Sequence, residues 1–256
     1  MKKKRLIYTL LYNKGYFMLS RNFRLQKVGD FSWLKKYYNF EKIAFSLDEL
    51  IVLDVTRENR NIDEFSSVLK DIVKNVFLPV SAGGGIRSID DAKLLLNSGA
   101  DKVVLNSTLY SNKDLIRDLV KIYGSQFVVG SIDYLTENNI NNVFIENGTV
   151  KIDKRLEEYI DDVEELSIGE IYLNSIQKDG TGQGYDISLL DDVFKKITTP
   201  VILAGGAGNA FHLIDGLRQS SVDAVATANL FNFLGDSLPK SRRQIIENNI
   251  PIAKFH

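Results

Sequence analysis

Two glycine-rich turns, half a chain apart, constrain the fold more than any other feature of this sequence. Residues 79–87 read Pro-Val-Ser-Ala-Gly-Gly-Gly-Ile-Arg, and residues 200–208 read Pro-Val-Ile-Leu-Ala-Gly-Gly-Ala-Gly. Each turn follows a short apolar run and precedes a helical pattern. Glycines between a strand and a helix leave backbone N–H groups open to an anion. The pair therefore predicts a phosphate site at each of two equivalent points of a duplicated chain.

The repeat extends beyond the glycines. Pro79 and Pro200 lie 121 positions apart, and residues 100–107 parallel residues 222–229 at a spacing of 122. A period this long indicates a duplicated half-barrel rather than a solenoid. Alternation of β-rich runs with amphipathic segments indicates a parallel sheet. We expect a single (β/α)8 TIM barrel domain over residues 1–256, with strands at 5–10, 49–54, 79–82, 102–105, 127–133, 170–175, 200–204 and 224–228.

Amphipathic segments between these strands predict the helices. One of them starts at Ser88, a capping residue followed by acids, and ends at Gly99. The alternation of strands and helices has one exception, after the fifth strand. There the turn residues 146–149 predict a β-hairpin within residues 138–153. Because it follows a strand directly, this hairpin should lie on the active face of the barrel. The other helices are expected at 62–75, 111–123, 154–167 and 186–197.

Composition narrows the function. A chain of 256 residues with 44% hydrophobic residues suits one barrel. Lys+Arg 32 against Asp+Glu 33 argues against nucleic acid or an anionic membrane as the main partner. The absence of cysteine excludes disulfides and thiolate chemistry, and two histidines offer little for a metal site, so we expect no metal and no cofactor. The basic N-terminus is interpreted as a first strand rather than a signal peptide, and no apolar run approaches the roughly 20 residues of a membrane span. We expect a cytoplasmic protein.

Active-site residues of such barrels lie at the C-terminal ends of the strands. Asp133 ends an apolar strand, where partial burial raises a carboxyl pKa toward neutrality, so it is the candidate general acid or base. Its alternative role is a helix N-cap or a loop acid. The residues expected to bind phosphate are Gly84, Gly85, Asn106 and Ser107 at one site, and Asp179, Gly180, Thr181, Gly205, Gly206, Ala228 and Asn229 at the other; residues 179–181 have a plain βα turn as their alternative.

From Lys4 to about Phe233, the chain resembles the cyclase subunit of imidazole glycerol phosphate synthase, the barrel partner of a glutaminase. The sister isomerase of histidine biosynthesis shares the barrel and the glycine turns. The Gly-Tyr-Asp of residues 184–186 and the Gly-Gly-Ala-Gly of residues 205–208 are closer to the cyclase. Other specific segments are residues 48–56, 83–87, 99–103, 124–126, 169–171 and 179–181.

The resemblance implies a route for ammonia. In that family, ammonia from the glutaminase enters the base of the barrel through a ring of charges. An ion-pair ring that only closes the barrel base is the alternative role for these side chains. Positions that face the glutaminase in the family match Asp101 and Gln126. The positions that match the ammonia gate are Arg5, Glu49, Lys102 and Glu170.

The active face departs from the family. The family uses two aspartates as acid and base, of which one matches Asp133 and the other falls at Leu11. A lysine near the family's substrate falls at Leu19. Leucine transfers no proton, and loss of one member of an acid–base pair typically costs about 10²–10⁴-fold in rate. The base of the barrel, where ammonia would enter, therefore resembles the family. The active face, where catalysis takes place in the family, differs from it.

These observations favour a paralogue that binds a glutaminase, conducts ammonia and binds a phosphorylated small molecule. Its ammonia would go to a sugar amidotransferase that forms an acetamidino group on a surface polysaccharide such as lipopolysaccharide. The alternative is a genuine imidazole glycerol phosphate synthase, a lyase of histidine biosynthesis, whose acid has moved, for example, to Asp54. A scaffold without ammonia traffic is a third possibility, against which the complete charge ring argues.

Overall fold

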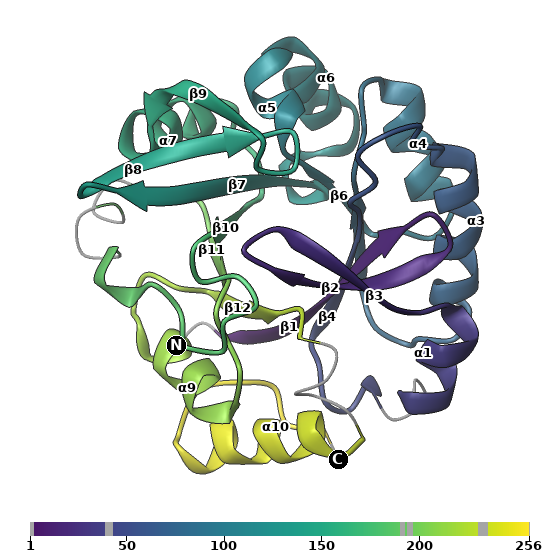
Figure 1. Ribbon diagram of the computed structural model, residues 1–256, viewed down its shortest axis with the longest axis vertical. Coiled ribbons are helices and arrows are strands. Elements are labelled where there is room, and N and C mark those ends of the chain that lie inside the picture. Colours follow the sequence, from purple (N-terminus) through teal and green to yellow (C-terminus); the bar gives the residue numbers. More distant parts are fainter. Residues whose placement is uncertain (1–2, 39–42, 190–192, 194–196, 230–234, 256) are drawn as a thin grey trace.

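Eight parallel strands pair in a closed ring, which confirms the barrel predicted from the sequence. The computed structural model describes residues 3–38, 43–189, 193, 197–229 and 235–255. Figure 1 shows the helices outside the ring of strands. The barrel strands, in ring order, are β1 (Arg5–Asn13), β4 (Glu49–Asp54), β5 (Val80–Gly83), β6 (Lys102–Leu105), β7 (Val128–Glu137), β10 (Glu170–Ser175), β11 (Val201–Ala204) and β12 (Ala224–Thr227).

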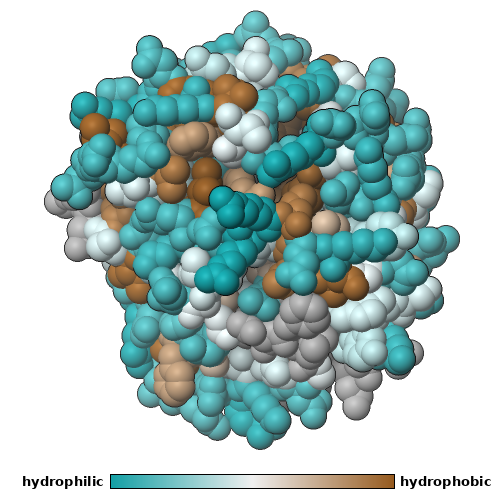
Figure 2. Space-filling model, viewed as in Figure 1, coloured by the Kyte–Doolittle hydropathy of each residue, from teal (hydrophilic) through white to brown (hydrophobic). Residues whose placement is uncertain are grey.

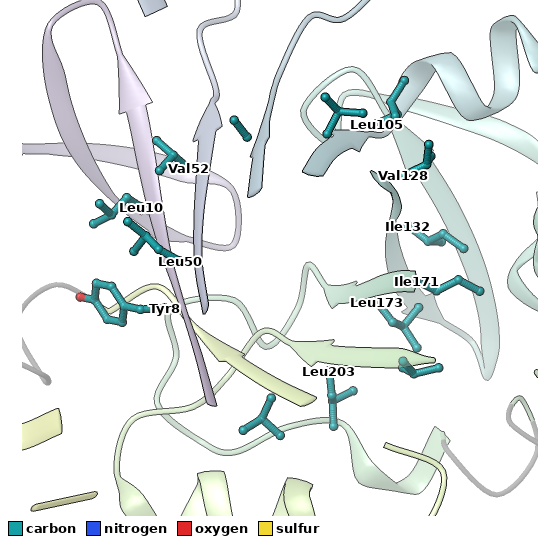
Figure 3. Close-up of a cluster of buried hydrophobic side chains, with 14 of the residues drawn as sticks. Tyr8, Leu10, Leu50, Val52, Leu105, Val128, Ile132, Ile171, Leu173 and Leu203 are labelled. Atoms are coloured by element: carbon teal, nitrogen blue, oxygen red, sulfur yellow. The ribbon is translucent and has the colours of Figure 1, made fainter. Parts of the chain in front are cut away.

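Alternation along each strand separates two apolar layers. On β1, Leu6, Tyr8 and Leu10 point outward into the large core between strands and helices, part of which Figure 3 shows. Ile7 points into the barrel, where it packs with Ile51 of β4. Neighbouring side chains of a strand face opposite sides, so nearly continuous apolar strands fill both layers.

The half-barrel duplication is visible in matching hydrogen bonds. The Asp101 carboxylate accepts the Val80 N–H at 2.8 Å, and the Asp223 carboxylate accepts the Val201 N–H at 3.1 Å. The backbone N–H of each aspartate donates back to the carbonyl of the same valine, at 2.7 and 2.9 Å. The two aspartates therefore join equivalent strands, β5 to β6 and β11 to β12.

Two antiparallel hairpins extend barrel strands at the mouth, the end where the strands terminate. The hairpin of β8 (Ile140–Ile145) and β9 (Val150–Arg155) follows β7, as predicted. The hairpin of β2 (Tyr16–Arg21) and β3 (Arg24–Gly29) follows β1 and was not predicted. It lies across the barrel in Figure 1. Both parent strands run past their expected ends because their extensions pair with the hairpins.

The helices agree with the predicted pattern in most places. Ser88 caps α4 as expected, and it also forms a capping box with Asp91. The helix expected at 111–123 is divided at Asn112, whose side chain caps α6. The range 186–197 lies partly outside the described residues. The helices are α1 (Phe31–Tyr37), α3 (Ile62–Val73), α4 (Ile89–Asn97), α5 (Ser107–Ser111), α6 (Lys113–Tyr123), α7 (Leu156–Glu164), α9 (Ala210–Arg218) and α10 (Ser237–Glu247), with 3-10 turns η1 (Ser125–Phe127) and η2 (Ile187–Leu189).

In the part of the chain that the structure describes, no helix is long and apolar enough to cross a bilayer.

A buried ion pair fastens α10 to the base of the barrel. The Arg242 guanidinium is 3% exposed and donates to both carboxylate oxygens of Asp48, at 3.0 and 2.9 Å. It also donates to the carbonyl of Ala253 at 2.6 Å. Removing one partner of such a pair leaves a buried charge without compensation.

We therefore expect Arg242→Ala to lower the free energy of unfolding by about 3–5 kcal/mol in urea denaturation. The matched control is Arg243→Ala at the adjacent, exposed position. It should change the free energy of unfolding by less than about 0.5 kcal/mol. Equal losses in the two variants would contradict a specific role for the buried pair.

Candidate functional site

A deep cavity opens at the mouth of the barrel. Its open space, solvent at the mouth included, is about 1320 Å³. Both glycine turns line it, so the two halves of the duplicated chain meet in one site. Every residue predicted to bind phosphate lines the cavity except Thr181. The Thr181 hydroxyl instead donates to the Lys178 carbonyl at 2.8 Å, within its own loop.

Asp133 projects from β7 into this cavity. It lies inside the strand, opposite Phe144 of β8, so it does not cap a helix. Its two carboxylate oxygens accept hydrogen bonds at 3.1 Å from the side-chain amides of Asn106 and Asn174. Burial raises the pKa of Asp133 to about 7, against the opposing effect of the Asn174 hydrogen bond and with a contribution from the charge of Asp179. A carboxyl group of this kind exchanges a proton readily near neutral pH.

Leu11 and Leu19 lie in different surroundings. Leu11 of β1 is 9% exposed and lines the cavity together with Leu53, its neighbour in register on β4. Leu19 of β2 packs against the large outer core. An apolar side chain thus stands at the mouth at the Leu11 position, whereas Leu19 contributes to holding the hairpin.

Two further carboxylates line the cavity, and both are engaged. Asp54 accepts the Thr56 N–H at 2.9 Å and lies 3.5 Å from the Arg60 Nε. Asp179 accepts the Ser20 hydroxyl and, at 3.1 Å, the Phe23 N–H. Burial raises the pKa of both carboxyl groups. Asp179 therefore holds the β2–β3 hairpin, a contact that sequence analysis did not predict.

The β2–β3 hairpin is fastened over the mouth at its tip. Asn22 donates through its backbone N–H to the Asp179 carbonyl at 2.9 Å, and through its side chain to the carbonyls of Ile176 and Gln177 at 3.1 and 2.8 Å. In Figure 2, hydrophilic side chains cover the middle of this face, with hydrophobic patches beside them. The tip therefore covers part of the cavity.

Close backbone contacts explain the glycines of the two turns. Gly84 has a φ of +112°, and a Cβ there would lie 2.2 Å from the Asp54 carbonyl oxygen. Gly206 has a φ of +111°, and a Cβ there would lie 2.1 Å from the Gly184 carbonyl oxygen. Only glycine suits a positive φ with backbone this near. The turns are thus tightly packed as well as open to a ligand.

At the opposite end, the base, four charged side chains form a closed ring. Arg5 contacts Glu49 at 3.0 Å and also pairs with Glu170. Lys102 contacts Glu49 at 3.0 Å and Glu170 at 2.8 Å. Each charge therefore has two neighbours of opposite sign. The sequence predicted these four positions, and the structure brings their side chains together.

The interior between ring and cavity is mainly apolar. Ile7, Ile51, Val129 and Ile202 fill it above the ring. Tyr172, 5% exposed, reaches the cavity lining from this layer. The layer separates the charged base from the polar mouth without itself carrying charge.

Asp101 and Gln126 are exposed at the base, on the segments that lead into β6 and β7. The Asp101 carboxylate also holds Val80, as Asp223 holds Val201, so the repeat gives Asp101 a structural role. Among the described residues, no group of three or more metal-ligating side chains forms a metal site.

Comparison with known proteins assigns the family. The sequence profile described as histidine biosynthesis protein matches residues 26–235. The chain belongs to the HisF family of histidine biosynthesis proteins. A Parasynechococcus marenigrum protein, provisionally named imidazole glycerol phosphate synthase subunit hisF2, is 46% identical to it over 95% of this chain and 91% of that protein.

Two other HisF relatives carry the plain name imidazole glycerol phosphate synthase subunit HisF. The Hydrogenobaculum protein is 37% identical over 80% of this chain and 82% of its own length. The Leptospira biflexa protein is 34% identical over 80% of this chain and 81% of its own length. The family resemblance found in the motifs is therefore confirmed across most of the chain.

The raised pKa of Asp133 predicts a pH-dependent stability. Between about pH 4 and pH 7 the native protein retains a proton that the unfolded chain has released, so this contribution to stability is complete at low pH and is lost as the pH rises to 7. We expect the wild type to lose about 2–4 kcal/mol more across this window than Asp133→Asn. Urea unfolding at several pH values measures the difference.

Asp118→Asn, on the exposed surface of α6, is the matched control and should follow the wild-type profile. Parallel pH profiles for the wild type and Asp133→Asn would show that Asp133 is ionised in the native protein throughout this range.

Proposed function

We propose that this HisF-family barrel is one subunit of a glutamine amidotransferase of the imidazole glycerol phosphate synthase type. It binds a glutaminase at the base, conducts ammonia through the barrel and delivers it at the mouth. A sugar amidotransferase receives this ammonia and uses it to form an acetamidino group on a surface polysaccharide. A phosphorylated small molecule binds between the two glycine turns.

One contrast carries the proposal: a complete charge ring at the base and a leucine at the mouth. Arg5, Glu49, Lys102 and Glu170 form alternating contacts at the base. Leu11 lines the cavity that holds Asp133. Ammonia is small and uncharged, so the apolar interior suits its passage better than that of a charged ammonium ion. The charged residues proposed to admit ammonia are thus present at the base, while a leucine takes the place of one proton-transferring aspartate at the mouth.

The base also offers apolar surface for a partner. Phe77 is 80% exposed just before β5, and Phe45 and Ile122 are 59% and 55% exposed on the segments before β4 and β7. Since parallel strands all begin at the base, these side chains surround the end of the barrel that holds the ring. Exposed aromatic and aliphatic groups near a functional opening favour protein docking.

We expect Phe77→Asp to weaken binding to the co-encoded glutaminase by at least about tenfold, because it places a charge in an apolar contact. Phe211→Asp is the matched control: Phe211 is 67% exposed at the start of α9, on the mouth side. It should leave the dissociation constant unchanged. Titration calorimetry measures both, and failure of the wild type to bind at micromolar concentration would overturn the glutaminase assignment.

A genuine cyclase is the second candidate, favoured by the raised pKa of Asp133 and by the HisF names of the relatives. A cyclase needs a second acid or base. Asp54 is held by Thr56 and Arg60, and Asp179 is held by the hairpin. Neither carboxylate is positioned as a second group without rearrangement, which favours the first candidate.

We expect ammonium-dependent synthesis of imidazole glycerol phosphate by the native chain to be at least about 10²-fold below that of a HisF relative with both aspartates. Leu11→Asp should raise it, since it returns a carboxylate to the cavity that holds Asp133. Leu53→Asp is the control, because it adds a carboxylate to the same cavity on the adjacent strand and should not raise it. High native turnover that Asp133→Asn abolishes would support the second candidate instead.

A further inference from the structure

Three arginines gather beside the first glycine turn; two of them, Arg57 and Arg60, lie outside the segments that carry the family resemblance. Arg57 and Arg60 lie between β4 and α3, and Arg87 is the last residue of the turn segment 79–87. All three line the cavity together with Gly84 and Gly85. An anion that reaches the N–H groups of this turn therefore meets guanidinium groups as well.

Arg60 lies directly against the turn. A Cβ added at Gly85 would be 2.4 Å from the Arg60 Cδ and 2.7 Å from its Nη1. The guanidinium is held by the Thr56 carbonyl, which accepts from Nη2 at 2.6 Å, and by the nearby Asp54 carboxylate. Among the described residues, its Nη1 makes no hydrogen bond. Arg60 is thus fixed in place with a donor left for a ligand.

Glu146 marks a point where an anion is stable in this cluster. It lies in the turn between β8 and β9, and its Oε1 accepts from the Arg87 Nη2 at 2.7 Å. The hydrogen bond from Arg87 lowers the pKa of Glu146, and the charges of Arg87 and Arg60 add to the effect. The Glu146 side chain is 43% exposed, so it can move away.

The charges around the cluster leave a place for a ligand anion. Asp54 pairs with Arg60, and Asp91 accepts the backbone N–H groups of Arg87 and Ser88 as part of the α4 cap. Among the described residues that line this part of the mouth, Glu146 is the remaining acid. Its carboxylate accepts from Arg87, and its backbone N–H donates to the Ser107 hydroxyl at 3.1 Å. Arg57 donates to the Phe23 carbonyl at 2.8 Å, which joins the cluster to the hairpin tip.

We infer that Arg60 and Arg87 extend the first glycine turn into a subsite for two adjoining phosphates, so that the ligand of the mouth is an organic diphosphate. One phosphate contacts the N–H groups of the turn. The other replaces Glu146 between Arg60 and Arg87. Guanidinium groups bind phosphate oxygens in pairs, and one turn provides donors for a single phosphate. This inference rests on the part of the proposed function that gives the mouth a phosphorylated ligand.

The test compares inorganic pyrophosphate with inorganic phosphate on the purified full-length chain at constant ionic strength. Titration calorimetry should give a dissociation constant for pyrophosphate at least about tenfold lower than for phosphate. Arg60→Gln and Arg87→Gln should each reduce that preference about tenfold. Glu146→Gln should strengthen pyrophosphate binding, because it removes the competing carboxylate. Arg117→Gln, which removes an exposed charge on α6, should leave both constants unchanged.

Equal affinities of the wild type for the two anions would overturn the inference. So would tighter binding by Arg60→Gln, since Arg60 would then cover the turn rather than serve it. Arg87 is half-exposed, so Arg87→Gln provides the result even where Arg60→Gln fails to fold. The measurement needs no glutaminase, so a failed diphosphate subsite and a failed glutaminase complex are distinguished.

Discussion

Alternating charge at the base of the barrel is the interaction on which the rest of the interior depends. Burying a charge is costly unless a partner of opposite sign accompanies it, and loss of one partner leaves an uncompensated charge. In the ring, Glu49 and Glu170 are each shared by Arg5 and Lys102, so no member lacks a neighbour. The neutral ring closes the barrel end, and a mainly apolar layer lies above it.

The mouth is organised differently, because polar side chains there hold the buried carboxyl of Asp133. Asn106 and Asn174, from the ends of two different strands, hold Asp133 in position. Leu11 and Leu53 add apolar side chains to the far wall of the cavity, and burial of Asp133 itself favours its protonated carboxyl. The buried carboxyl of Asp133 and the charged ring therefore lie at opposite ends of one barrel, separated by a mainly apolar layer.

Much of the fold could be predicted from the sequence, because its signals are local or repeated. The glycine turns and the long repeat predicted the barrel, and the strand pattern at residues 128–133 placed Asp133 at the mouth. The β2–β3 hairpin was missed because residues 16–29 lack a simple alternation of apolar and polar side chains. Contacts between distant segments, such as Arg60 with Gly85 and Asp179 with Ser20, leave no local pattern, so only the structure reveals them.

The hydrogen bonds that hold the β2–β3 hairpin over the mouth have a kinetic consequence. Its tip is held to the loop after β10 by Asn22, Ser20 and Phe23, and to the loop after β4 by Arg57. A ligand reaches the covered part of the cavity when several of these hydrogen bonds open together, a motion that takes microseconds to milliseconds in proteins. At high ligand concentration the observed association rate then reaches a plateau equal to the opening rate of the hairpin. The same hydrogen bonds lengthen the residence time of a bound molecule.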